Sequence, residues 1–177
     1  MELVTKIAFF FLVLIMYLER LYELKISKRN NQIILARGGR IHETPGLAKA
    51  MRVVNLSWFP VMLLEVFLLD RMISPMIGAP AAFVVAFTNL LRLMSMQALG
   101  YRWTIDIATL PLPPVRTGIY RFARHPNYIG VLLEIPALPL IHGAWLTSIV
   151  YGIANAVFMF KKIRVEEEKL EEAGAGR

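Results

Sequence analysis

The sequence predicts an all-α integral membrane protein of about five transmembrane helices, the last two forming a hairpin. Three observations predict this class. The 177 residues are 56% hydrophobic and have a mean hydropathy of +0.53, which is more apolar than a typical soluble domain. The apolar residues form long blocks, and a helix needs roughly 20 of them to cross a bilayer. Basic residues gather between alternate blocks. We therefore expect one membrane domain over residues 1–177.

The first apolar block, residues 3–19, is followed by a charged segment rather than by a small-residue cleavage site. This predicts an uncleaved first span. Residues 22–36 can continue the same helix, and Gly38-Gly39 would end it. A tight turn at Gly143 would separate the last two, short spans. The remaining spans are expected at residues 53–69, 76–98, 127–141 and 143–160.

Charge predicts the orientation of these spans. Basic residues are concentrated in residues 19–52, residues 99–126 and the tail after residue 160. With five spans all three regions lie on one side, which the positive-inside rule makes cytoplasmic, with the N-terminus outside. Residues 1–98 then hold three spans and a basic cytoplasmic loop at residues 20–52. The net charge of +7 suits loops that face anionic lipid headgroups, so membrane lipids and not nucleic acid are the expected partners.

Several kinds of chemistry are excluded by composition. The chain has no cysteine, which excludes disulfides, thiolate metal sites and cysteine nucleophiles. Its three histidines, His42, His125 and His142, are far apart in the sequence. We therefore expect no metal site.

Charge inside a membrane span is costly and needs a reason, and three charged residues in the later predicted spans stand out. They are Glu65 in the second span, Arg92 in the third and Glu134 in the fourth. We interpret Glu65 as structural. Arg92 and Glu134 can pair inside the bundle or extend towards an interface, or they can serve function. Glu134 is a functional candidate because of the residues that precede it.

A stretch rich in Arg, His, Tyr and Gly, residues 116–130, lies at the cytoplasmic mouth of the fourth span. Pro126 suits the first turn of a helix. The positive end of that helix could hold a carboxylate, such as the amino-acid end of a cofactor. His125 could donate hydrogen bonds, and Tyr120 and Tyr128 could pack on an aromatic ring.

A second polar cluster, residues 161–170, follows the fifth span. Lys162 and Glu166 are four residues apart, as are Arg164 and Glu168, so each pair shares a helix face. A solvated helix end would explain these charges by itself. However, this cluster and residues 116–130 occupy the two outer ends of one hairpin, so they must lie near each other.

Together these residues resemble a known family. The element Arg124-His125-Pro126-Asn127-Tyr128-x-Gly130, followed by Glu166-Glu167-x-x-Leu170, resembles the isoprenylcysteine carboxyl methyltransferase family. That family is similar to the membrane phospholipid N-methyltransferases. The resemblance implies S-adenosylmethionine as methyl donor and a lipophilic or lipidated acceptor, with residues 99–170 forming the cofactor-binding and catalytic region. The donor contacts that it implies are Leu112, Pro113, Pro114, Val115, Tyr120, Arg124, His125, Tyr128 and Glu166.

The acceptor determines which catalytic groups are needed. The family usually has an arginine four residues before the first Glu of its acidic motif, and here that residue is Lys162, with Arg164 nearby. A carboxylate acceptor needs only a cation to orient it, and Lys162 or Arg164 could serve. A phenol-like or enol acceptor must lose a proton, and Glu134, Glu167 or His125 could accept it. The sequence leaves both acceptors open.

The N-terminal segment Glu19-Arg20-Leu21-Tyr22-Glu23-Leu24, with residues 27–30 and 37–39, resembles a bacterial subgroup. Some of its members are thought to O-methylate long-chain alkylpyrones or alkylresorcinols. This implies a bacterial inner membrane protein with its active site on the cytoplasmic side.

Two other functions are compatible with the sequence. An NADPH-dependent sterol-type reductase would have a similar C-terminal membrane architecture, but such enzymes are normally longer and have more spans. A non-enzymatic membrane scaffold would tolerate substitutions around His125 and Glu166.

Overall fold

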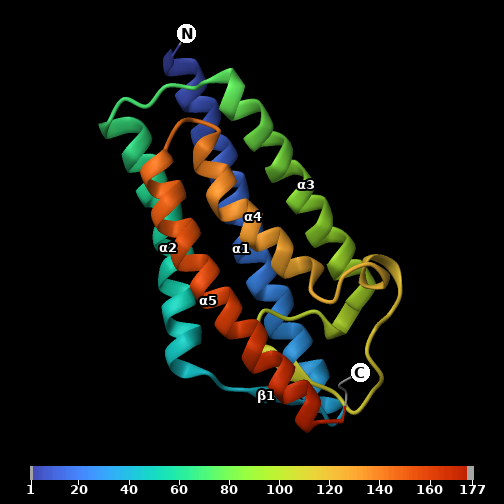
Figure 1. Cartoon of the computed structure of the whole chain (residues 1–177). Coiled ribbons are helices and arrows are strands. Elements are labelled where there is room, and N and C mark those ends of the chain that lie inside the picture. The colour runs from blue at the N-terminus through green and yellow to red at the C-terminus, as the bar shows by residue number, and fades with distance from the viewer. Residues whose placement is uncertain (1, 175–177) are drawn as a thin grey trace.

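The computed structural model describes residues 2–174 and is dominated by helices that run side by side (Figure 1). The start of the first helix, the connection at residues 69–74 and the turn at residues 141–144 lie at one end, which we call the turn end. The end of the last helix and two short strands lie at the opposite, ribbon end. The long helices are α1 (Glu2–Ala36), α2 (Pro45–Leu68), α3 (Pro75–Leu99), α4 (Pro126–Leu140) and α5 (Trp145–Glu172).

Within the described residues 2–174, three helices are long and apolar enough to cross a membrane: α2, α5 and the helical segment Pro75–Arg102, which contains α3. They indicate an integral membrane protein. α4 has 15 residues, which is short for a span, and α1 carries Lys6, Glu19 and Arg20 in or beside its apolar part. Five spans with an outside N-terminus therefore stay a prediction.

The segment expected as a basic loop at residues 20–52 is mostly helical. α1 continues to Ala36 and α2 already begins at Pro45, so only residues 37–44 connect them. Gly38, with φ 78°, follows the end of α1 as predicted. A Cβ on Gly39 would lie 2.7 Å from the Thr109 carbonyl oxygen, so this glycine permits close approach of the strands.

The all-α prediction missed a small antiparallel ribbon at the ribbon end. β1 (Arg40–His42) pairs with β2 (Ile107–Thr109). His42 Nε2 lies 2.9 Å from Thr109 Oγ1, across the ribbon. Strands of three residues are too short to show a sequence period. Two short 3₁₀ helices, η1 (Gly100–Arg102) and η2 (Gly118–Arg121), were also not predicted.

α4 and α5 form the predicted hairpin, and small residues let them approach closely. A Cβ on Gly152 of α5 would meet the Pro136 Cβ at 3.2 Å. Ser148 Oγ donates to the Pro136 carbonyl oxygen at 2.8 Å, and such interhelical bonds are common in membrane bundles. Gly143 turns the chain with φ 72°, and a Cβ there would lie 2.7 Å from the Met72 carbonyl oxygen.

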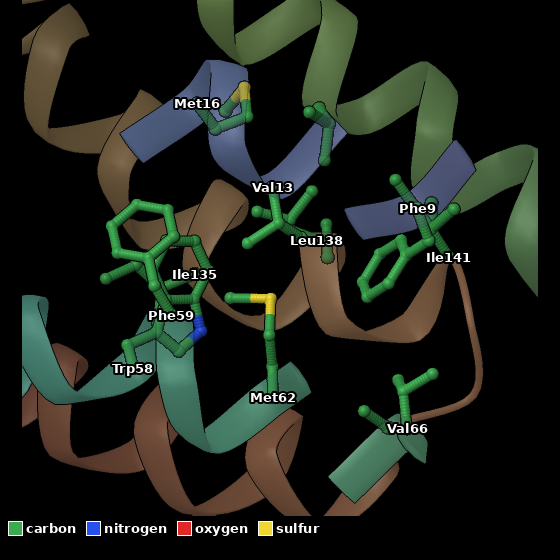
Figure 2. Packing of buried hydrophobic residues seen from close by; sticks show 14 residues of the cluster. Phe9, Val13, Met16, Trp58, Phe59, Met62, Val66, Ile135, Leu138 and Ile141 are labelled. Carbon is green, nitrogen blue, oxygen red and sulfur yellow. The ribbon is translucent and has the colours of Figure 1, made fainter. Parts of the chain in front are cut away.

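The hydrophobic core occupies the half of the bundle nearer the turn end. Figure 2 shows side chains from α1, α2 and α4 meeting there. Buried polar side chains lie at both ends of the bundle, for example Glu65 and His142 at the turn end and Asn30 towards the ribbon end. The labelled core residues are Phe9, Val13, Met16, Trp58, Phe59, Met62, Val66, Ile135, Leu138 and Ile141.

Glu65 has the structural role that we expected of it. Its carboxylate accepts the backbone N–H groups of Leu146 and Thr147 at 3.1 and 2.7 Å. It also accepts Thr147 Oγ1 at 2.7 Å and Arg71 Nε at 3.1 Å. These backbone groups belong to the first turn of α5, so Glu65 caps that helix from α2.

We expect Glu65→Ala to lower the free energy of unfolding by about 1–2 kcal/mol, the range for a lost helix cap. Thermal unfolding in detergent measures this change. Glu65→Gln keeps one carboxyl-like oxygen as acceptor and should lose less. Equal stability of wild type and Glu65→Ala would contradict the capping role.

Candidate active site

A cavity of about 680 Å³ opens at the ribbon end. This volume lies in the range of small-molecule sites, about 300–1,000 Å³. Its walls come from the end of α3, η1, the connection at residues 103–117, η2, the first turn of α4 and the last turns of α5. Segments that are distant in the sequence therefore meet around one space.

All nine residues predicted as donor contacts line this cavity. They come from three separate parts of the chain, the proline-containing segment 112–115, the segment 120–128 and the end of α5. The structure brings them together, and their role as donor contacts stays a prediction. They are Leu112, Pro113, Pro114, Val115, Tyr120, Arg124, His125, Tyr128 and Glu166.

Residues from the two motifs are joined by direct contacts. The Tyr128 hydroxyl donates a hydrogen bond to the Glu166 carboxylate. The His125 ring stacks on the Tyr128 ring, with centroids 5.3 Å apart and an interplanar angle of 9°. His125 Nε2 lies 3.5 Å from Glu167 Oε1, and Arg124 Nη1 lies 3.3 Å from the same oxygen. The first turn of α4 is thereby tied to the last turns of α5.

Local sequence explains this arrangement. Pro126 is the first residue of α4, as predicted, and His125 takes the N-cap position. Proline is favoured there because its fixed φ suits a helix start. Tyr128 then projects from the first turn, one turn after His125, so the two rings can stack.

Tyr120 also lines the cavity. Burial of its hydroxyl, together with the nearby Glu166 carboxylate, raises the pKa of Tyr120 to about 12, although a hydrogen bond with Ser95 acts in the opposite sense. At neutral pH the phenol therefore stays protonated. Tyr120 can donate a hydrogen bond to a ligand but is not suited to accept a proton from one.

Two cavity residues hold buried polar atoms without hydrogen-bond partners, Asn127 Oδ1 and Trp103 Nε1. Such atoms are rare because leaving them unpaired costs free energy. Both atoms are shielded from solvent, so in this arrangement they do not face the open space of the cavity. Asn127 lies within the motif 124–130 that carried the resemblance, and Trp103 lies in residues 100–104, which resemble the bacterial branch of the family, but neither was predicted as a site residue.

The wall carries charges of both signs. Most of the arginines follow α3 or lie in the connection to α4, whereas most of the carboxylates come from α5. Such a wall suits a ligand that itself carries both charges. The arginines are Arg102, Arg116, Arg121 and Arg124, and the carboxylates are Asp106, Glu166, Glu167 and Glu171.

The predicted catalytic residues are not all brought together. Glu167 lines the cavity. Lys162 is buried next to the cavity wall. Its Nζ donates to the Ile105 carbonyl oxygen at 2.6 Å and lies 5.0 Å from the Tyr128 ring centroid. The Arg164 side chain is 84% exposed and pairs with Glu168 at 3.2 Å, as its spacing predicted. It is not part of the cavity wall.

Glu134 belongs to a buried ring of four charged residues, which we call the ion ring. Its carboxylate pairs with Arg92 and with Arg20. Glu23 pairs with the same two arginines, at 3.0 Å from Arg92 and 2.8 Å from Arg20. The interpretation that Arg92 and Glu134 pair inside the bundle is confirmed. Arg20 and Glu23 were missed, because they were expected in the loop that follows the first span.

The membrane-capable helices and the ligand-sized cavity define a class, that of small integral membrane proteins with a ligand-binding site. Residues 81–172, more than half of the chain, match the isoprenylcysteine carboxyl methyltransferase (ICMT) family, and the chain belongs to that family of membrane methyltransferases. Methyltransferases of this family use S-adenosylmethionine in general.

A bacterial relative matches over almost the full length. The uncharacterized protein YpbQ of Bacillus subtilis (strain 168) is 28% identical over 165 residues, which cover 93% of this chain and 97% of the relative. No solved structure matches the chain. Within residues 2–174, no group of three or more His, Asp or Glu side chains is placed to hold a metal ion.

Proposed function

We propose that the protein is an S-adenosylmethionine-dependent O-methyltransferase that acts on a lipophilic acceptor at the cytoplasmic face of a bacterial inner membrane. One observation carries the proposal. Tyr128 is hydrogen-bonded to Glu166 in the wall of one ligand-sized cavity. The two residues are 38 positions apart, and each belongs to one of the two motifs that resemble the family. The family match supports the reaction class.

The cavity residues fit the methyl donor. Glu166 and Glu167 suit its ammonium group, and the arginines of the opposite wall and the N-terminus of α4 suit its carboxylate. When bound, the donor supplies a methyl group that is already activated on a sulfonium. The protein then needs to orient the two reactants and to exclude water.

The acceptor is either a prenylcysteine-type carboxylate or the hydroxyl of an alkylpyrone or phenolic lipid. For a hydroxyl acceptor, Glu167 and His125 line the cavity 3.5 Å apart and are placed to take the proton. For a carboxylate acceptor, the cation must come from the cavity wall, because Lys162 is bonded to Ile105 and Arg164 lies outside. Because four arginines line the cavity, both acceptors stay part of the proposal.

We expect calorimetry of the purified protein in detergent to show S-adenosylmethionine binding and no NADPH binding. His125→Ala should weaken donor binding about tenfold, because it removes the stacking partner of Tyr128 and a contact of Glu167. His142→Ala is the control for loss of a histidine, since His142 is buried but lies at the turn end. Its donor affinity should equal that of wild type.

The alternatives give other results. Preference for NADPH would identify a reductase, and a folded protein that binds neither cofactor would indicate a scaffold. Once donor binding is established, a screen of prenylcysteines against alkylpyrones, with a labelled methyl group, identifies the acceptor.

A further inference from the structure

We propose that three polar residues of α1, Ser27, Asn30 and Asn31, are positioning residues for the donor cavity. They do not line it, and α1 lies outside the residues that match the family, 81–172. They act on residues 100–106, which form one wall. The inference rests on the proposed function for the identity of the ligand, but the fixing of this wall can be tested without a ligand.

Asn30 holds both ends of the turn that follows α3. Its Nδ2 donates to the Trp103 carbonyl oxygen at 2.7 Å and to the Gly100 carbonyl oxygen at 3.3 Å. The side chain belongs to a residue that is only 7% exposed. One buried amide thus fixes the backbone at the start and the end of residues 100–103, and Trp103 carries its indole into the cavity wall.

Ser27 and Asn31 fix the next three residues. Ser27 Oγ accepts the Ile105 N–H at 3.0 Å and lies 2.9 Å from Thr104 Oγ1. Thr104 Oγ1 donates to Asn31 Oδ1 at 2.6 Å, and Asn31 Nδ2 donates to Asp106 Oδ2 at 2.6 Å. Thr104 and Asp106 both line the cavity. Gly100 and all of residues 103–106 are therefore hydrogen-bonded to α1.

The spacing of these three residues is the physical basis of the contact. Residues 27, 30 and 31 are related by three and four positions, so they share one face of α1. The same helix is held in place further along by Arg20 and Glu23 of the ion ring. α1 therefore presents a fixed row of polar groups to a segment that has no regular structure of its own between η1 and β2.

Lys162 holds the wall segment from the other side. Its Nζ donates to the Ile105 carbonyl oxygen at 2.6 Å, from α5. Ile105 is thus held through its N–H by Ser27 and through its carbonyl by Lys162. The ammonium group of Lys162 is engaged at the wall rather than offered to an acceptor. Residues 100–106 therefore lie between α1 and α5 and are hydrogen-bonded to both helices.

The test compares two buried asparagines. Asn30→Ala should weaken S-adenosylmethionine binding about tenfold in calorimetry, the effect of losing a well-formed buried hydrogen bond. Asn155→Ala is the matched control, because Asn155 is also buried and its Nδ2 donates to the Val131 carbonyl oxygen within the hairpin. It should lower the melting temperature but leave donor affinity within about twofold of wild type, since its bond lies outside the wall segment. If Asn30→Ala folds poorly, Asn31→Ala is a milder variant. We expect it to weaken donor binding several-fold.

A second readout does not need the donor. In a background where Trp58 and Trp145 are replaced by Phe, fluorescence reports Trp103 alone. Loosening of the wall should shift its emission to the red and increase its quenching by acrylamide, roughly twofold or more, in Asn30→Ala but not in Asn155→Ala. Unchanged Trp103 fluorescence together with unchanged donor affinity would overturn the inference. If the wild type binds no donor, the proposed function fails, and the quenching result still decides whether α1 fixes the wall.

Discussion

Arg92→Leu should lower the free energy of unfolding by about 3–5 kcal/mol, the cost of removing one partner from a buried ion pair. Arg92 is 4% exposed and contacts both carboxylates of the ion ring, Glu23 and Glu134. Its loss leaves two buried carboxylates with only Arg20 between them. Unfolding by SDS in mixed micelles, followed by circular dichroism, measures the change.

The physical reason lies in the balance of the ring. Two arginines and two glutamates alternate, so each carboxylate lies between two guanidinium groups and the formal charges cancel. Bringing charges out of water is costly, and only close opposite charges offset that cost. Because the ring joins α1, α3 and α4, an unbalanced charge also weakens the contact between these helices.

The double variant Arg92→Leu with Glu134→Leu is the decisive control. It removes one charge of each sign and leaves Arg20 paired with Glu23 at 2.8 Å. It should therefore be more stable than Arg92→Leu alone. If the losses of unfolding free energy in Arg92→Leu and in Glu134→Leu simply add up to the loss in the double variant, the four residues do not act as a ring. A folded double variant that still transfers methyl groups would also show that Glu134 is a structural residue rather than a catalytic one.

The ion ring also shows what sequence reasoning could reach. Arg92 and Glu134 were noticed because charge inside an apolar block is unusual. Arg20 and Glu23 follow the block in a segment rich in charges, and the resemblance of that segment to a bacterial subgroup implied no structural role for them. The same holds for Ser27 and Asn30, whose partners Thr104 and Trp103 lie 77 and 73 positions away. Only the three-dimensional packing of α1 against residues 100–106 reveals their role.

The C-terminal half of the site was more accessible to prediction. The motif residues share short segments, so the hairpin alone brings them together. Helical phase could also have separated Lys162 from Arg164. At 3.6 residues per turn they lie roughly 200° apart, whereas Lys162 and Glu166 lie about 40° apart. Lys162 and Glu166 both contact Tyr128, whereas Arg164 faces outward. The ribbon of three-residue strands offered no comparable signal.

Glu166→Ala should reduce methyl transfer about 100-fold, the effect of a misplaced reactant in a catalytic site. Glu166 both lines the cavity and accepts the Tyr128 hydroxyl. Its removal takes away a negative charge that suits the donor ammonium and frees Tyr128 to move. Transfer of a labelled methyl group to the acceptor found by the screen measures turnover, and calorimetry measures donor affinity separately.

Tyr128→Phe separates the two contributions of Glu166, which are its negative charge and its hydrogen bond with Tyr128. Phenylalanine keeps the ring that stacks on His125 and lies near Lys162, and it loses only the hydroxyl bonded to Glu166. We expect a loss of about tenfold, since one charge-assisted hydrogen bond is removed and the carboxylate remains. Glu168→Ala, on the exposed side of the same helix, should behave as wild type. If Glu168→Ala impairs transfer as much as Glu166→Ala, the acidic end of α5 acts through its overall charge. If only Glu166→Ala does so, the cavity geometry carries the chemistry.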